Sequence, residues 1–183
     1  MAIGTQEFAA VRMAIRQATE ADAKKLSIYF SQIAMEPGNN TGVRDGIFPL
    51  TVAAQRKMIQ RYKEQENSVL IIAEADGKIL GVAGLEGGNT LFNRHSTLLH
   101  LNVRRGYRGA GIGSALLDVA LDWARRQPMI RRVELEVLAR NTGAIRLYER
   151  MGFVSEGYRH LAYQLPEEGD NVYVDSLEMA YYL

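Results

Sequence analysis

The stretch Arg108-Gly109-Ala110-Gly111-Ile112-Gly113-Ser114 decides how this chain folds. It lies between an apolar run at 97–103 and a segment whose apolar residues repeat at helical spacing. Glycine tolerates positive φ and lets the backbone approach a ligand closely. Because a helix begins there, its free amides and the positive end of its dipole form a site for phosphate oxygens. The loop therefore predicts an anion site, to which Arg104, Arg105 and Arg108 add positive charge; the alternative is a tight turn with a solvated basic flank.

Two other phosphate-binding loops fit this sequence poorly. A dinucleotide-binding loop follows its strand directly with the spacing G-x-G-x-x-G, but the sixth position counted from Gly109 is Ser114. Five residues also separate Val103, the expected end of the strand, from Gly109. The G-K-[S/T] ending of a triphosphate-binding P-loop is absent. An NAD-binding protein is therefore a weaker interpretation of the loop.

Hydrophobic periodicity and turn residues on both sides of the loop indicate a mixed α/β chain. Asp76-Gly77 joins two β-rich runs and is typical of a tight hairpin turn. At 132–138, apolar residues alternate with Glu134 and Glu136, as in a strand with one buried face. Further strands are expected at 11–17, 97–103, about 153–164 and 172–182, and helices at about 20–35, about 51–65, after Gly111 and from Asn141 to Gly152. Hairpins and crossover helices would then serve one sheet.

The composition is that of one globular domain, expected to span residues 11–183 after an N-terminal tail at 1–10. The 22 Lys and Arg nearly balance the 21 Asp and Glu, so a net charge of +1 gives little attraction toward nucleic acid or anionic lipid. No segment approaches the roughly 20 apolar residues of a membrane span, which predicts a cytoplasmic protein. The absence of cysteine excludes thiolate nucleophiles, and the three histidines lack metal-ligand spacing, so no metal is expected.

The glycine loop resembles the pyrophosphate loop of the GNAT acetyltransferases, whose pattern Q/R-x-x-G-x-G/A begins a helix after a sheet strand. Arg108, Gly111 and Gly113 match that pattern. A second block, LEVLARNTGAIRLYERMGF at 135–153, resembles the strand and helix that follow in this family. The resemblance implies a GNAT fold, an α/β (α+β) architecture with one mixed, mainly antiparallel sheet of about seven strands flanked by about four helices. The second block looks most like the amino-acid, polyamine and ribosomal-protein N-acetyltransferases.

The resemblance also implies where acetyl-CoA would bind. In the family, the strand before the loop splays away from the next strand, and the pantetheine arm lies in the gap, bonded to the main chain. Leu101 and Val103 occupy the strand positions that would make those contacts. Backbone amides at 109–114 would hold the pyrophosphate. Asn141, seven residues before Tyr148, would bond the pantetheine, although asparagine is equally expected there as a plain helix N-cap.

Two residues are expected to move protons. In similar enzymes a tyrosine at the position of Tyr148 protonates the departing thiolate, and a phenol with a pKa of about 10 stays protonated at neutral pH. On helical spacing alone, that tyrosine would be a core residue. Glu136 fills the position at which the ribosomal-protein alanine N-acetyltransferases carry the base for the amine. A glutamate on the polar face of a strand is otherwise a solvated residue.

Other residues are weaker candidates for the base. Glu86 and His95 could approach the acceptor from neighbouring segments, and a chain of water molecules could replace a single base. Thr97 and Leu99, on the strand before the loop, carry no basic group. His100 is expected on the opposite face of that strand, as a packing or partly exposed residue.

These features together predict direct transfer of acetyl from CoA to a primary amine in a ternary complex, because no cysteine is present to form a thioester with the protein. The acceptor is expected to be an amino acid, a polyamine, another small amine or a protein N-terminus. The loop at 36–50, the second helix and the last hairpin would line its site. The alternative is a catalytically silent acyl-CoA-binding or sensor protein. By analogy with relatives, edge strands would admit a homodimer.

Overall fold

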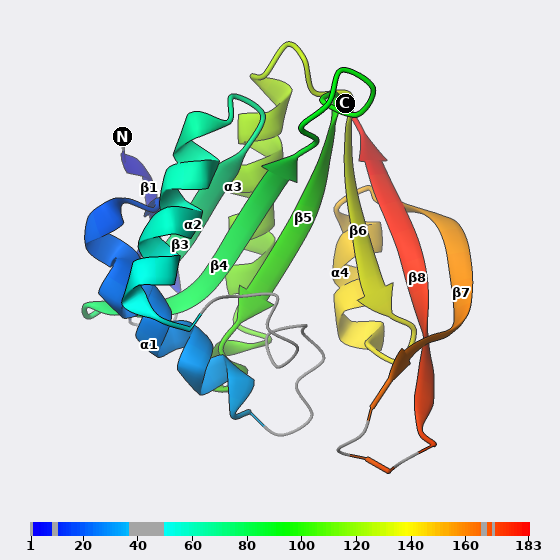
Figure 1. Cartoon of the computed structure of the whole chain (residues 1–183). Helices are drawn as coiled ribbons and strands as arrows, with labels where there is room; N and C mark the ends of the chain where they lie inside the picture. The colour runs from blue at the N-terminus through cyan, green and yellow to red at the C-terminus, as the bar shows by residue number, and fades with distance from the viewer. Residues whose placement is uncertain (1, 9–10, 37–49, 166–167, 170) are drawn as a thin grey trace.

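The computed structural model describes residues 2–8, 11–36, 50–165, 168–169 and 171–183. Its strands are β1 (Ala2–Phe8), β2 (Val11–Gln17), β3 (Val69–Ala75), β4 (Lys78–Gly87), β5 (Ser96–Val103), β6 (Arg132–Leu138), β7 (Val154–Gln164) and β8 (Tyr173–Tyr182). They form one sheet in the order β1-β2-β3-β4-β5-β6-β8-β7 (Figure 1). Neighbouring strands are antiparallel except β5 and β6, which are parallel. The mixed, mainly antiparallel sheet that the sequence predicts is confirmed.

Helices cover both faces of this sheet. Within the described segments they are α1 (Ala23–Ala34), α2 (Val52–Glu64), α3 (Ile112–Arg125) and α4 (Thr142–Arg150), with short 3-10 turns at η1 (Glu20–Asp22) and η2 (Arg105–Tyr107). Figure 1 shows α1 and α2 on one face and α3 and α4 on the other. These bounds agree with the predicted helices to within a few residues. Nowhere in the described chain is a helix long and apolar enough to cross a membrane.

The N-terminal residues depart from the prediction. The sequence predicts a tail at 1–10, but residues 2–8 form β1 and pair with β2, with Phe8 opposite Val11. The sheet therefore has eight strands where about seven were expected. This pairing is made by main-chain groups, and it covers the edge of β2. It therefore requires no pattern of side chains by which the sequence would predict a strand. Most of the predicted acceptor loop at 36–50, residues 37–49, lies outside the described residues.

The hairpin between β3 and β4 forms as Asp76-Gly77 predicts. Both residues have positive φ, 48° at Asp76 and 71° at Gly77, which is the conformation that a tight two-residue turn requires. The strands pair from Val69 opposite Leu85 to Ala75 opposite Lys78. On its other side β4 pairs with β5, at the centre of the sheet.

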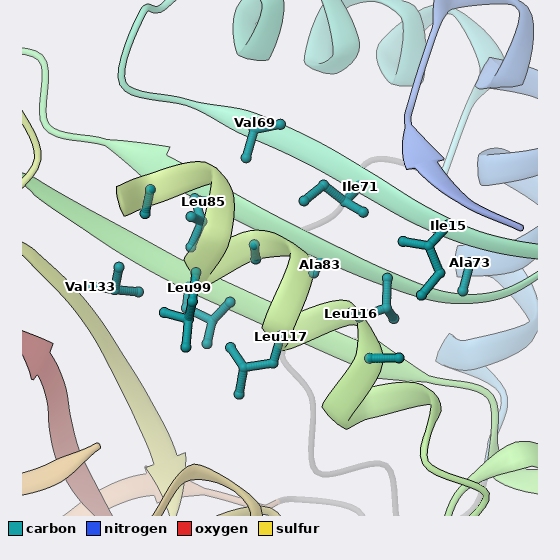
Figure 2. Packing of buried hydrophobic residues seen from close by; sticks show 14 of the residues in the cluster. Ile15, Val69, Ile71, Ala73, Ala83, Leu85, Leu99, Leu116, Leu117 and Val133 are labelled. Atoms are coloured by element: carbon teal, nitrogen blue, oxygen red, sulfur yellow. The ribbon is translucent and has the colours of Figure 1, made fainter. Parts of the chain in front are cut away.

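Two hydrophobic clusters hold the layers together. On one face, α3 lies across the strands, and Leu116 and Leu117 pack with Ile71, Ala83 and Leu85 (Figure 2). On the other face, residues of α1 and α2 pack on the opposite sides of the same strands. The buried members of that second cluster include Leu26, Phe30, Ile33, Met58, Tyr62, Ile72 and Val82. The central strands are thus buried on both sides.

Strands β5 and β6 separate soon after they pair. Their parallel register covers only Ser96–Arg132, Thr97–Val133 and Leu98–Glu134. Beyond Leu98 the two strands diverge, as Figure 1 shows. Backbone groups that a continuing ladder would use are consequently open to a ligand between the strands.

Gly84 tests the packing of α2 on β4. A Cβ at this position would lie 2.7 Å from the Tyr62 hydroxyl oxygen and 3.2 Å from its ring, and Tyr62 is itself buried. We expect Gly84→Ala to lower the free energy of unfolding by about 1–3 kcal/mol, measured by urea denaturation. The control is Gly106→Ala, where a Cβ meets nothing within 4 Å and the change should stay within about 0.5 kcal/mol. Equal losses for the two variants would contradict this account.

Candidate functional site

A cavity of about 430 Å³ opens between the end of β5, the start of α3 and the first turns of α4. Its lining comes from these three elements and the glycine loop that joins two of them. The lining residues are Leu101, Asn102, Val103, Arg108, Gly109, Gly111, Gly113, Ser114, Asn141, Gly143, Ala144, Leu147, Tyr148 and Arg150. The cavity therefore lies beside the part of β5 that extends beyond its register with β6.

The glycine loop forms one end of the cavity. Gly109 and Gly111 have φ of 79° and 84°, and Gly111 is the N-cap of α3. Its carbonyl accepts the first helical hydrogen bond, from the Ala115 amide at 3.0 Å. A Cβ on Gly113 would lie 3.3 Å from Leu147, so this glycine keeps α3 close to α4. The first amides of α3 are thus presented to the cavity at the positive end of the helix dipole.

Arg108 has partners of its own near this end. Its Nε donates to the Val103 carbonyl oxygen at 2.7 Å, and its Nη2 lies 2.6 Å from a carboxylate oxygen of Glu36. The second Glu36 oxygen accepts from the Arg105 amide at 2.9 Å. One carboxylate beyond the end of α1 therefore fixes both η2 and the Arg108 side chain. Glu36 therefore offsets the charge of Arg108 at this end of the cavity.

Asn141 begins α4 beside the cavity. Its side-chain oxygen accepts from the Ala144 amide at 3.3 Å, so it is the N-cap of the helix. The same residue lines the cavity. The two interpretations that the sequence left open are thus compatible, because one oxygen caps the helix while the amide nitrogen can still reach a ligand.

Tyr148 lies two turns further along α4, at the side of the cavity. It is only 7% exposed, and its ring packs against Phe153 with centroids 5.6 Å apart. Burial raises the pKa of Tyr148 to about 12, since a phenolate would lose its hydration there. No hydrogen bond to its hydroxyl is seen within the described parts of the chain. The group is therefore a protonated donor at the wall of the cavity.

The structure gathers most of the predicted binding residues at this cavity. Ala110 and Ile112 do not line the cavity. Ala110 is exposed, and Ile112, the first residue of α3, is buried in the core. Sequence reasoning missed Asn102, Gly143, Ala144, Leu147 and Arg150 as lining residues. Helical spacing from Asn141 would have found Ala144, three residues later, and Leu147, three residues after that.

Glu136 lies away from the cavity lining, on β6, in a polar cluster with β7 and β8. Arg159 donates to one of its oxygens at 2.8 Å, and the Tyr163 hydroxyl donates to the other at 2.8 Å. The Ser176 hydroxyl also donates to this carboxylate. The carboxylate is therefore already engaged by an ion pair and two hydroxyl groups.

The other candidate bases lie at different depths. His95 is exposed in the turn before β5. Glu86 is half-buried on β4 and lies 3.1 Å from Arg61 Nη2. His100, on β5, has a 25% exposed side chain, with Nε2 3.9 Å from a Glu86 oxygen. Among the described residues, no group of three or more His, Cys, Asp or Glu side chains could hold a metal ion.

Comparison with known proteins assigns the class. Residues 43–153, more than half of the chain, match the family described as acetyltransferase (GNAT) family. The chain therefore belongs to the GNAT acetyltransferase family. The resemblance inferred from the glycine loop and the second block is confirmed.

Individual relatives share part of this sequence. A probable N-acetyltransferase, camello, of Xenopus laevis is 35% identical over 96 residues, which are 50% of this chain and 41% of that protein. Streptothricin acetyltransferase of Streptomyces lavendulae is 32% identical over 102 residues, 56% of this chain and 52% of that protein. The chain thus spans about half the length of the curated relatives it matches.

Solved structures share the whole fold. An acetyltransferase of the GNAT family from Streptococcus pneumoniae superimposes with a TM-score of 0.87 at 27% identity, covering 93% of this chain and 99% of that one. The structure of yncA from Salmonella typhimurium with its cofactor acetyl-CoA has a TM-score of 0.74 at 20% identity, covering 93% and 94%. The GNAT fold that the sequence predicts is confirmed.

Asn141 offers a test of the helix cap. Asn141→Ala removes the oxygen that accepts from the Ala144 amide, and we expect it to lower the free energy of unfolding by about 1 kcal/mol in urea denaturation. Asn141→Ser is the matched control, because serine also caps helices and should retain most of that stability. If alanine and serine gave the same stability as asparagine, the cap would contribute nothing.

Proposed function

We propose that this protein transfers an acetyl group from acetyl-CoA to a primary amine. The observation that carries the proposal is the cavity beside the end of β5, with a helix N-terminus at one end and a protonated tyrosine at its wall. The amides of α3 suit a pyrophosphate, and the unpaired edge of β5 suits the amide groups of a pantetheine arm. The residues present therefore fit this co-substrate.

The transfer is direct in this proposal. The chain contains no cysteine, so the common thiol-linked acyl-enzyme route is unavailable to it. The amine nitrogen attacks the thioester carbonyl, the C–N bond forms, and the C–S bond breaks. One proton leaves the nitrogen and one reaches the departing sulfur, so the products are an N-acetylated amine and the free thiol.

Tyr148 is the proposed acid for the sulfur. Its raised pKa keeps the hydroxyl protonated across the working range, so it can donate to the thiolate in every turnover. Its burial against Phe153 fixes the ring, which limits the positions that the hydroxyl can take. Positioning of this kind is what general acid catalysis requires.

The acceptor in this proposal is a primary amine of an amino acid, a polyamine, another small amine or a protein N-terminus. Relatives bearing the names streptothricin acetyltransferase and N-alpha-acetyltransferase support an amine as the acceptor class. A homodimer belongs to the proposal as well, since β1 and β7 are the edge strands to which a second copy would pair. Light scattering gives the molar mass that tests it.

Thiol release tests the activity directly. The purified protein is mixed with acetyl-CoA and, in turn, alaninamide, putrescine and a peptide with an N-terminal alanine, and a thiol reagent reports free CoA. The protein has no thiol of its own, so the signal has no protein background. Turnover with any of these amines supports the proposal. Tight binding of CoA in calorimetry without turnover of any amine would favour a silent acyl-CoA-binding protein.

Tyr148→Phe should lower kcat by about 100-fold or more, because the acid is removed and ring packing is kept. The affinity for CoA, measured by calorimetry, should change far less. In the unaltered protein, a pKa of about 12 predicts no loss of activity from ionisation of Tyr148 below about pH 10. Full turnover by Tyr148→Phe across the pH range with every competent amine would remove Tyr148 as the acid.

Glu136→Gln distinguishes two functions for that residue. To act as the base that the resemblance implies, Glu136 would need an oxygen able to accept the proton of the amine. Its contacts with Arg159 and Tyr163 favour instead a structural role, in which it joins β6 to β7. We expect the variant to retain kcat within about 10-fold, since general base catalysis contributes about 100-fold or more. A larger loss, with the acid limb of the pH profile removed, would make Glu136 the base.

A further inference from the structure

Arg150 is a basic side chain at the wall of the cavity. It is the last residue of α4, and it lines the cavity. No hydrogen bond or ion pair of its guanidinium is seen among the described residues. Arg108, the other arginine of the lining, lies 2.6 Å from a Glu36 carboxylate oxygen. Within the described segments, Arg150 is therefore the lining arginine whose charge is not offset by a carboxylate.

Arg150 belongs to the side of α4 that is turned toward α3. Gly143, Leu147 and Arg150 recur at spacings of four and three residues, so they form one stripe along the helix. All three line the cavity. A Cβ on Gly113, in the first turn of α3, would lie 3.3 Å from Leu147. The stripe therefore runs beside the N-terminus of α3.

The space along this stripe lies on the side to which the Arg150 side chain extends. The Cα–Cβ bonds of a helix point toward its N-terminus, so a long side chain covers the turn that precedes it. Gly143 has no side chain, and a Cβ there would meet nothing within 4 Å. From Gly143 to Arg150 the helix rises about 10 Å. One side of α4 thus offers open space at its start and a guanidinium toward its end.

The negative charge of CoA exceeds what the start of α3 can offset. Besides its pyrophosphate, CoA carries a phosphate on the 3′ carbon of its ribose. A helix N-terminus presents a partial charge of about +0.5, and its amides suit one anionic group. Asp and Glu are absent from the lining residues of the described chain. A second phosphate therefore needs a cation, and the wall holds no carboxylate that competes for that cation.

We propose that Arg150 binds the 3′-phosphate of the co-substrate and so selects CoA over donors that lack this phosphate, a proposal that rests on the acetyl transfer proposed above. A planar guanidinium donates two parallel hydrogen bonds to a phosphate, a geometry that suits recognition. An acetyl group carried on a phosphopantetheine without the nucleotide would lack this contact. Arg150 is thus a specificity residue for the donor and takes no part in the proton transfers.

Calorimetry with CoA and with 3′-dephospho-CoA tests the contact without any turnover. The unaltered protein should bind CoA about 10-fold more tightly, since a hydrogen bond to a charged group contributes about that factor. Arg150→Gln should weaken CoA binding about 10-fold and leave the affinity for 3′-dephospho-CoA within about 2-fold. Equal affinity of the unaltered protein for the two ligands would overturn the proposal. Equal weakening of both ligands by Arg150→Gln would overturn it as well, because the contact would then be with the pyrophosphate.

Arg146→Gln is the matched control. Arg146 is an exposed arginine of the same helix, and it does not line the cavity. Its variant should keep the preference for CoA, and the thermal midpoints of both variants should match that of the unaltered protein, because both positions are exposed. Loss of the preference in Arg146→Gln as well would overturn the proposal, since the net charge of the helix would then account for it.

Kinetics separate this contact from the proposed function. With a competent amine, Arg150→Gln should raise the KM for acetyl-CoA about 10-fold and leave kcat within about 2-fold, because the phosphate is bound equally before and during the reaction. A loss confined to kcat would overturn the assignment of Arg150. A preference for CoA without turnover of any amine would instead count against the proposed function. Absence of CoA binding would overturn both.

Discussion

The parallel pairing of β5 with β6 lasts for three residue pairs, and the rest of the site depends on where it ends. A parallel pair needs a long crossover, which α3 provides. Because the strands separate after Leu98, the sheet is divided into β1–β5 and β6–β8, with a gap instead of a continuous ladder. Each half still satisfies its own hydrogen bonds, since β5 pairs with β4 along its length and β6 pairs with β8. The gap therefore leaves the pairing within each half intact.

Packing behind the gap keeps it from closing. On the second half, Tyr148 packs on Phe153, and Phe153 packs on Tyr181 of β8, with centroids 5.6 Å apart in both cases. Gly152, with φ of 91°, ends α4 so that Phe153 can turn back beneath it. On the first half, the contact of Gly113 with Leu147 fixes how closely α3 and α4 approach. The cavity thus lies between two packed groups of side chains.

Features that depend on neighbouring residues could be predicted from the sequence. The Asp76-Gly77 turn, the Asn141 cap and the Gly111 helix start each follow from local backbone preferences, and all three form. Pairings between distant segments could not be predicted in the same way. Glu36 meets Arg108 across 72 positions, and Arg159 meets Glu136 across 23. Such contacts decide which charges are already paired, so the position of the glycine loop was predictable while the partners of Arg108 and Glu136 were not.

The two faces of the sheet differ in what they offer at the gap. On the α3 and α4 face, helix amides and apolar side chains meet, which suits an anionic molecule with a long neutral arm. On the α1 and α2 face, His100 and Glu86 lie beside Arg61 within a largely buried layer. The apolar and amide-lined cavity therefore lies on one face of β5, and the charged side chains of Glu86 and Arg61 lie on the other.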